Sequence, residues 1–401
     1  MIDFKKYKCS YILFSGLTLY FMGNRYLQYF VSDGLCSLSS LLGMFLILIA
    51  LLFYSTGMRG IDFPARVLFV LFLLSNLFVV LHGFVDSGLD VGALVAAKRD
   101  FSNYLTPLLM LCFWRCFYIK PCIVMALVSC LLGLLFVAGN VTELVLSPAI
   151  LSMGFFDTYI VNRISVPLVC VAPSFLLLLY KDVPVSVKRF VLVSTLVSLV
   201  VLLLSGRRSG AFTILLCYLC YFAINIKRKG VRLALFMCGL AVLVLWPMIF
   251  DAFGAKFSFL MSRLGDDTRS GVEHDLIRDM DAFSWIFGRG LYGTYYSPTA
   301  IDSIHRGMIE TGYLHMILKG GMINLTLYVA LLLRTVYNGI FKSRNNLGVA
   351  FGYLALMYLV RLYPGGHINM TFEFCILWFG IAFCNYRRLY MASNDEIKKY
   401  L

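Results

Sequence analysis

Arginine and acidic side chains gather in one polar interval of an otherwise apolar chain, residues 251–321. The interval contains five arginines and ends in the sequence GMIETGYLHMILKGGMINL, which runs into the next apolar segment. A guanidinium binds phosphate through paired hydrogen bonds, and a positioned carboxylate can act as a general base. Glu310, just before the apolar segment, is the carboxylate that we single out.

Composition places these residues in an integral membrane protein. Of the 401 residues, 60% are hydrophobic and 14% are charged, whereas soluble domains carry about 25% charged residues. Apolar runs such as residues 35–54 are long enough to cross a hydrocarbon core of about 30 Å as a helix. The sequence therefore predicts an all-α membrane protein, in which the first apolar run is a retained helix and not a cleaved signal peptide.

The apolar runs predict about twelve transmembrane helices in a single polytopic domain, residues 1–401. The predicted spans are residues 11–30, 35–54, 67–85, 104–118, 122–139, 166–180, 190–204, 211–226, 233–250, 312–333, 347–362 and 370–384. Residues 251–311 then form a long loop between the ninth and tenth spans. The spans must position whatever chemistry this loop carries.

Positive charge assigns the two faces of the membrane. With both termini in the cytoplasm, every strongly basic short loop falls on the cytoplasmic side, as the positive-inside rule requires. The long loop and the SGRRSG turn at residues 205–210 then lie on the opposite face. In a bacterium this arrangement predicts an inner-membrane protein with a periplasmic site.

Several arginines on this opposite face are exceptions to the charge rule. Arg207 and Arg208 lie at the ends of two predicted spans with no acid nearby in the sequence, which favours a phosphate-binding role. The other arginines on this face are Arg163, Arg263, Arg269, Arg278, Arg289, Arg306 and Arg361. For the loop members, the alternative is a structural ion pair with a loop aspartate, or contact with a lipid headgroup.

Two segments of the long loop have patterns of their own. From Ser270 to Ile286, apolar residues recur at helical spacing, which predicts an amphipathic helix that packs or lies on the membrane surface. The following FGRGLYGTYY predicts a flexible segment. Its glycine spacing lacks the βαβ context of a dinucleotide-binding site, so we reject that interpretation.

Composition also argues against metal and nucleic-acid chemistry. The twelve cysteines lie mostly inside apolar runs, where free thiols pack as small apolar side chains, and none combines with histidines at zinc-ligand spacing in a loop. We therefore expect no metal and no cofactor. The net charge of +14 belongs to short loops and not to a soluble basic domain, so we expect no nucleic-acid partner.

Four motifs in the C-terminal half resemble, in order and spacing, the superfamily of O-antigen polymerases and O-antigen ligases. They are SGRRSG, TRSGVEHDL, WIFGRGLYG and ETGYLHMILKGGMINL. The resemblance covers the chain from about Arg163 onward and is looser before it. It places the family's arginines on Arg208, with Arg207 in the preceding serine position, on Arg269 and on Arg163.

The last motif distinguishes two branches of the superfamily. In ligases it begins with histidine and asparagine and ends in a glycine eleven positions after the histidine. Counting back from Gly321 puts Glu310 on the histidine, Thr311 on the asparagine and Tyr313 on a following aromatic residue. Since polymerases commonly tolerate an acid at this point, the resemblance favours a polymerase. His305 lies nearby but out of register.

The resemblance implies a GT-C-like glycosyltransferase that works without a metal. Its substrate would be an undecaprenyl-diphosphate-linked oligosaccharide, transferred to a second lipid-linked repeat with release of the lipid diphosphate. Glu310 would be the general base and Arg208 would stabilise the leaving diphosphate. The residues that would bind diphosphate or glycan are Arg207, Arg269, Arg163, Arg278, Arg289, His305, Arg306 and Tyr313. Besides membrane lipids, a flippase and a chain-length regulator are the implied partners.

Three alternatives stay open. Glu310 could be an ordinary acid at a helix N-terminus, stabilised by the helix dipole. The chain could be a ligase, which differs in its acceptor, the lipid A core. It could also be a transporter of lipid-linked glycans or anions, although no internal repeat relates its halves and its polar groups gather at one face instead of at the midplane.

Overall fold

The computed structural model describes residues 4–23, 32–55, 57–58, 60–86, 103–112, 175–179, 183–204, 208–225, 270–299, 304–363 and 372–397, with a few residues between 118 and 134. These residues are mostly helical, as the composition predicts. The predicted ninth span, residues 233–250, lies outside the described residues, as do residues 251–269 of the long loop.

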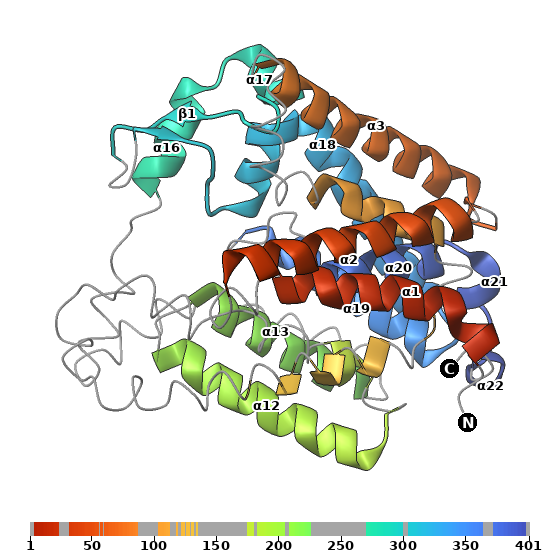
Figure 1. The fold of residues 1–401 in the computed structure, drawn as a ribbon. Coiled ribbons are helices and arrows are strands. Elements are labelled where there is room, and N and C mark those ends of the chain that lie inside the picture. The colour runs from red at the N-terminus through yellow and green to blue at the C-terminus, as the bar shows by residue number, and fades with distance from the viewer. Residues whose placement is uncertain are drawn as a thin grey trace.

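The first two helices, α1 (Phe4–Phe21) and α2 (Asp33–Tyr54), pack side by side (Figure 1). Gly16 of α1 lies against α2 so closely that an added Cβ would be 2.9 Å from the Cβ of Leu46 and 3.0 Å from the carbonyl oxygen of Gly43. Small residues at such a point let two helix backbones approach, which is how membrane helices gain packing contacts without a hydrophobic driving force.

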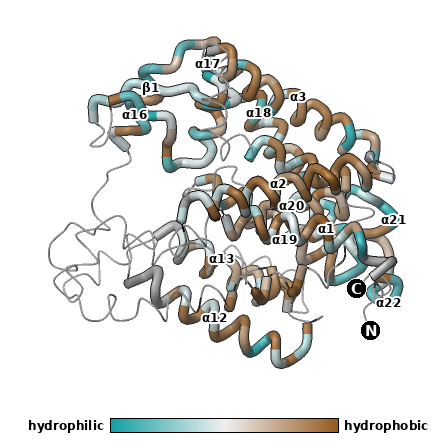
Figure 2. Tube along the Cα trace, in the orientation of Figure 1, coloured by the Kyte–Doolittle hydropathy of each residue, from teal (hydrophilic) through white to brown (hydrophobic). Residues whose placement is uncertain are grey.

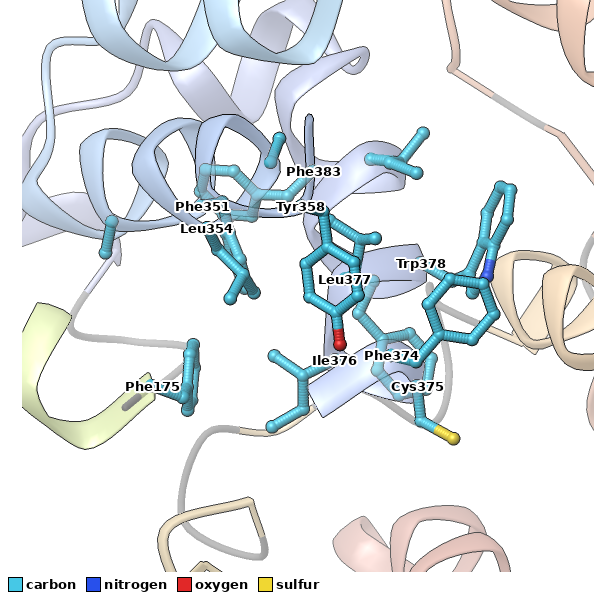
Figure 3. Close-up of a cluster of buried hydrophobic side chains, with 14 of the residues drawn as sticks. Phe175, Phe351, Leu354, Tyr358, Phe374, Cys375, Ile376, Leu377, Trp378 and Phe383 are labelled. Carbon is cyan, nitrogen blue, oxygen red and sulfur yellow. The ribbon is translucent and has the colours of Figure 1, made fainter. Parts of the chain in front are cut away.

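Aromatic side chains hold together the central helices α3 (Phe63–Asp86), α18 (Gly312–Val336), α19 (Asn346–Arg361) and α20 (Phe372–Cys384). Trp378 of α20 is fully buried, and its ring stacks on Phe72 of α3 with 5.6 Å between centroids. Phe72 in turn stacks on Tyr328 of α18 at 5.7 Å. Figure 3 shows Trp378 and Phe374 in this cluster. The cluster joins helices that are far apart in the sequence.

Polar side chains in the same core find partners on neighbouring helices. Asn324 of α18 donates a hydrogen bond of 2.7 Å to the side-chain oxygen of Asn76 on α3. About 15 Å further along α18, in its last turns, Arg334 pairs with Asp62 at 3.1 Å and donates to Asn385 at 2.9 Å. A buried polar group without a partner costs about 1–3 kcal/mol, so these contacts fix how α3 lies along α18.

The remaining elements surround this core. They are η3 (Thr106–Cys112), α12 (Val185–Leu204), α13 (Arg208–Asn225), the π-helical continuation of α18 called η5 (Tyr337–Lys342), α21 (Arg387–Tyr390) and α22 (Asn394–Ile397). η3 packs on α20 and α2, α12 packs on α13, and α13 packs on α19. The long-loop elements lie beyond one end of α3 and α18 (Figure 1).

Three helical segments in the described part of the chain are long and apolar enough to cross a membrane: Gly34–Tyr54, Phe63–Val85 and Gly312–Lys342. The first two keep large apolar side chains on the outside, such as Leu52 in the first and Leu77 in the second, which are 78% and 53% exposed. Figure 2 shows these helices as mainly hydrophobic and the long-loop elements as more hydrophilic. Apolar exposure on this scale is compatible with contact to lipid.

Most predicted spans that fall on described residues are helical, but several boundaries differ, and two of these shifts place charged residues within a helix. α12 begins at Val185, so Lys188 and Arg189, predicted in a loop, are helical. α18 and η5 continue to Lys342, so Arg334, also predicted in a loop, lies within the helix. Its charge is compensated there by Asp62, which no local pattern reveals. The number of twelve spans and their orientation stay predictions.

Candidate functional site

The described part of the long loop folds onto one end of the bundle. It consists of α16 (Ser270–Asp279), α17 (Ala282–Phe287) and a two-stranded antiparallel pair, β1 (Tyr295–Tyr296) with β2 (His305–Arg306). Leu276 and Met280 are buried in a small apolar core that also contains Leu314 and Leu318 of α18. The loop is therefore fixed to the start of α18 by its own apolar contacts.

The single helix predicted from Ser270 to Ile286 is wrong, because two helices occupy this stretch. The break falls at Asp281, whose backbone is extended (φ −77°, ψ 169°) and whose carboxylate accepts a 3.0 Å hydrogen bond from the amide of Ser284. This is an N-cap, which starts a new helix. The pattern predicts one helix because the apolar spacing continues across the break.

A break in α18 receives the glycine-rich segment. Gly321 has φ +69° and ψ −178°, so the helix is interrupted and the carbonyl oxygens of Leu318 and Lys319 lose their usual helical donors. The amide groups of Arg289 and Gly290 donate to these two oxygens, at 2.7 and 3.0 Å. Backbone groups freed within an apolar helix are thereby satisfied by the loop.

The same segment has a second anchor on α3. The amide of Leu291 donates to the carbonyl oxygen of Val79 at 3.0 Å, and a Cβ at Gly83 would lie 2.6 Å from the Leu291 amide nitrogen. Lys319 is only 7% exposed, and its Nζ donates to the carbonyl oxygens of Leu291 and Gly293, both at 2.9 Å. The predicted flexibility of this segment is therefore wrong: two helices and a buried lysine hold its backbone.

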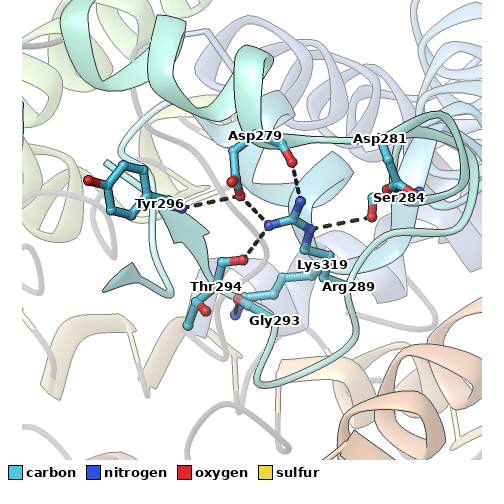
Figure 4. Close-up of polar contacts among 8 residues, drawn as sticks. All are labelled: Asp279, Asp281, Ser284, Arg289, Gly293, Thr294, Tyr296 and Lys319. Atoms are coloured by element: carbon cyan, nitrogen blue, oxygen red, sulfur yellow. Dashed lines mark hydrogen bonds and ion pairs between the residues drawn. The ribbon is translucent and has the colours of Figure 1, made fainter. Parts of the chain in front are cut away.

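Arg289, predicted to bind substrate, is engaged within the loop (Figure 4). Its guanidinium forms an ion pair with the carboxylate of Asp279 and also donates to the Asp279 carbonyl oxygen. Further bonds reach the carbonyl oxygen of Thr294 at 2.7 Å and the hydroxyl of Ser284 at 3.3 Å. The structure thus shows, for this arginine, the internal ion pair that was the alternative for the loop arginines.

An acid and two phenols surround the beginning of α18. The carboxylate of Glu273, on α16, accepts a hydrogen bond from the hydroxyl of Thr311, the residue that precedes the helix. Glu273 also lies within electrostatic range of the phenol groups of Tyr295 and Tyr313. We call this region, Glu273, Tyr295 and residues 310–313, the mouth of α18. It joins the polar loop to an apolar helix.

Tyr295 is the most enclosed side chain of the mouth. It is 1% exposed, and burial raises the pKa of its phenol, an effect that the charge of Arg306 opposes. Arg306 stands opposite Tyr295 in the strand pair. Among the described residues the Tyr295 hydroxyl has no hydrogen-bond partner.

The other predicted site residues that the structure describes lie around this mouth. Glu310 is exposed and directly precedes Thr311, while Tyr313 is half-buried. His305 is exposed on β2, its ring 5.8 Å from that of Tyr296, and Arg278 is exposed on α16. Glu310 and Tyr313 therefore lie at the junction of loop and helix, since α18 begins at Gly312; their role in a site stays a prediction.

The position of the arginines of the earlier motifs relative to the mouth is not described. Arg163, Arg207 and Arg269 lie outside the described residues. Arg208 is the first residue of α13, so the second half of the SGRRSG turn is helical.

Sequence reasoning did not assign three residues that the structure makes prominent. Glu273 has the sequence context of a surface acid on an amphipathic helix, and its contact with Thr311 spans 38 positions. Arg361 was placed on the same face as the loop but given no role. Lys319 did carry a signal, because a lysine inside a predicted span is rare and usually has a specific partner.

Comparisons with known proteins add no family assignment to this geometry. No family model, curated protein or solved structure matches the chain. The resemblance to polymerases and ligases thus depends on the four motifs alone. Two of these, WIFGRGLYG and ETGYLHMILKGGMINL, meet in space at the break in α18.

The buried carboxylate of Asp275 predicts how the loop responds to acid. It accepts hydrogen bonds from Thr299 and from the hydroxyl of Ser297 at 2.8 Å, and these bonds, Thr299's first, lower its pKa. A carboxyl whose pKa is lower in the folded state stabilises that state above its unfolded pKa of about 4, and this contribution is lost as the pH falls below that value.

We therefore expect Asp275→Asn to melt at a lower temperature than the wild type at pH 7. The difference should shrink as the pH falls from about 5 to 3, because the wild type then loses the same interaction. Thermal melting of both purified proteins in detergent across this range is the measurement. Parallel curves for the two proteins would contradict the assigned role of Asp275.

Proposed function

We propose that this chain is a membrane glycosyltransferase that polymerises oligosaccharide repeats carried on undecaprenyl diphosphate. The observation that supports it most directly is the mouth of α18, where the acids Glu273 and Glu310 lie at the junction of a polar loop and an apolar helix. A substrate with a polyprenyl tail and a glycan head needs both environments at one place.

The proposed reaction is the displacement of a lipid diphosphate by a sugar hydroxyl. The hydroxyl oxygen of the acceptor repeat forms a bond to the anomeric carbon of the donor glycan, and the bond from that carbon to the diphosphate oxygen breaks. Glu310 takes the hydroxyl proton as general base. The diphosphate leaves as an anion, for which Arg208, with Arg207 and Arg269, would supply positive charge.

The remaining residues divide by their surroundings. The proposed glycan contacts are residues on the loop surface or at the mouth: Arg278, His305, Arg306 and Tyr313. Arg163 keeps the role that the motif assigns to it. Arg289 is better suited to stabilise the loop than to bind substrate, because its guanidinium already bonds to Asp279, Ser284 and Thr294. Glu273 supports the site by holding Thr311, next to Glu310.

A sugar-polymer ladder tests the proposal. A host deleted for its own polymerase receives the native repeat-unit genes with wild type, Glu310→Gln or Arg208→Ala at matched membrane levels. Asp395→Asn, an exposed acid on α22, is the control. We expect wild type and control to make a ladder, and the first two variants to stop at a single repeat.

Two results would contradict the proposal in different ways. If wild type makes no ladder but attaches single repeats to the lipid A core, the enzyme is a ligase. If Glu310→Gln and Arg208→Ala both make the wild-type ladder, then the residues assigned to catalysis are wrong even though the activity is right.

A further inference from the structure

One arginine at the end of the bundle has a buried nitrogen without an acceptor. Arg361 is the last residue of α19, and its guanidinium carbon lies 5.0 Å from the centroid of the Tyr358 ring. Its Nη1 is buried and meets no hydrogen-bond acceptor among the described residues. A guanidinium stays ionised at all relevant pH values, so this N–H group needs an anionic or polar partner.

Two other arginines of the bundle and loop have an acidic partner. Arg289 pairs with Asp279, and Arg334 pairs with Asp62. Arg361 instead lies against the aromatic face of Tyr358, and its charge also acts on the phenol of Tyr328. A cation over such a face is attracted by the quadrupole of the ring, but the ring offers no hydrogen-bond acceptor of the strength of a carboxylate to the N–H group at Nη1.

Arg361 also lies next to the mouth of α18. The carbonyl oxygen of Leu362, its neighbour, accepts a 3.1 Å hydrogen bond from the amide of Tyr313. Tyr313 lies within electrostatic range of Glu273 and of Tyr363, which is 75% exposed. The end of α19 therefore borders the region where Glu310 and Glu273 lie, and it borders the surface.

We propose that Arg361 binds a phosphate group of the lipid-linked substrate at this mouth. A phosphate fits because it accepts two parallel bonds from the guanidinium fork, and because the end of an apolar helix is the depth at which lipid phosphates lie. This inference rests on the proposed function, to which it adds a positioning contact. Phosphate could come from the diphosphate of the carrier or from a bilayer phospholipid, and the two are tested separately.

Binding measured by native mass spectrometry separates these sources. Wild type, Arg361→Gln, Arg361→Lys and the control Arg388→Gln, an exposed arginine on α21, are each titrated with undecaprenyl diphosphate or with phosphatidylglycerol. We expect Arg361→Gln to bind undecaprenyl diphosphate about ten- to a hundredfold more weakly than wild type. Arg361→Lys should fall between them, and phosphatidylglycerol binding should not change.

Three outcomes would overturn the inference. Wild-type affinity of Arg361→Gln for undecaprenyl diphosphate excludes the contact. An equal loss for both lipids assigns the site to bilayer headgroups. If Arg361→Gln does not fold, Arg361→Lys decides: its charge is kept, so wild-type binding by this folded variant would show that the guanidinium fork is not used.

The proposed function can fail independently of this contact. Binding of undecaprenyl diphosphate that depends on Arg361, in a chain that makes no polymer ladder, keeps the phosphate site and rejects polymerisation. A wild-type ladder from Arg361→Gln together with wild-type binding rejects the phosphate site and keeps polymerisation.

Discussion

Gly321→Ala is expected to destabilise the protein by more than about 3 kcal/mol. The backbone at this position has φ +69° and ψ −178°, a conformation that is essentially restricted to glycine and costs other residues about 1–3 kcal/mol. In addition, an added Cβ would overlap the carbonyl group of Ile286. The carbonyl carbon and oxygen of Ile286 are backbone atoms, so no side-chain rotation can relieve the overlap.

The matched control for this substitution is Gly34→Ala in α2, where nothing lies within 4 Å of an added Cβ. Alanine is the better helix former, so this control should melt at or slightly above the wild-type temperature. Thermal melting followed by size-exclusion chromatography in detergent measures both variants. Equal melting of Gly321→Ala and wild type would mean that α18 is continuous at this point and does not receive the loop.

The second large effect is expected for Lys319→Met. Methionine has a similar length, so the side chain still fills its space, but the hydrogen bonds from Nζ to the carbonyl oxygens of Leu291 and Gly293 are lost. Each acceptor left without a partner costs about 1–3 kcal/mol, and we expect a total of about 2–4 kcal/mol.

The loss should also appear as faster cleavage of the loop. Limited proteolysis of Lys319→Met is expected to cut within residues 288–299 sooner than in wild type, because the buried end of this segment is released. Lys342→Met is the control, since Lys342 is exposed and lies over the ring of Tyr337 at 4.7 Å. If both methionine variants melt and are cut like wild type, Lys319 has no part in holding the segment.

The helices could be predicted from the sequence because a membrane crossing is a local property. A long apolar run and an internally hydrogen-bonded backbone are both required in lipid, and α2, α3, α19 and α20 follow from them. The two breaks, at Asp281 and Gly321, do not. The break at Asp281 is local, because the amide that caps it belongs to Ser284, but the apolar spacing that continues across it hides the cap. The break at Gly321 depends on a distant segment, whose amide groups donate to the freed carbonyl oxygens.

The candidate site shows the same division. Motif spacing placed Glu310 and Tyr313 at the start of α18, since both lie a fixed distance from Gly321 along one chain segment. The sequence identifies the arginines but not their partners. Arg289 lies beside a carboxylate in the fold and Arg361 lies beside an aromatic ring. For Arg289 the sequence left both a substrate contact and an ion pair with a loop aspartate open, and the structure shows the ion pair with Asp279.

The contact between Asn324 and Asn76 has a consequence for how the chain is made. The two residues are 248 positions apart, so at synthesis rates of about 5–20 residues per second α3 waits roughly 12–50 s for its partner. Throughout that time the side-chain oxygen of Asn76 needs a provisional donor, such as water, a lipid headgroup or an insertion factor. In a nascent chain that stops before α18, the side-chain oxygen of Asn76 never receives the hydrogen bond from Asn324. A truncated product therefore differs from the complete chain by an unsatisfied polar group within the bilayer.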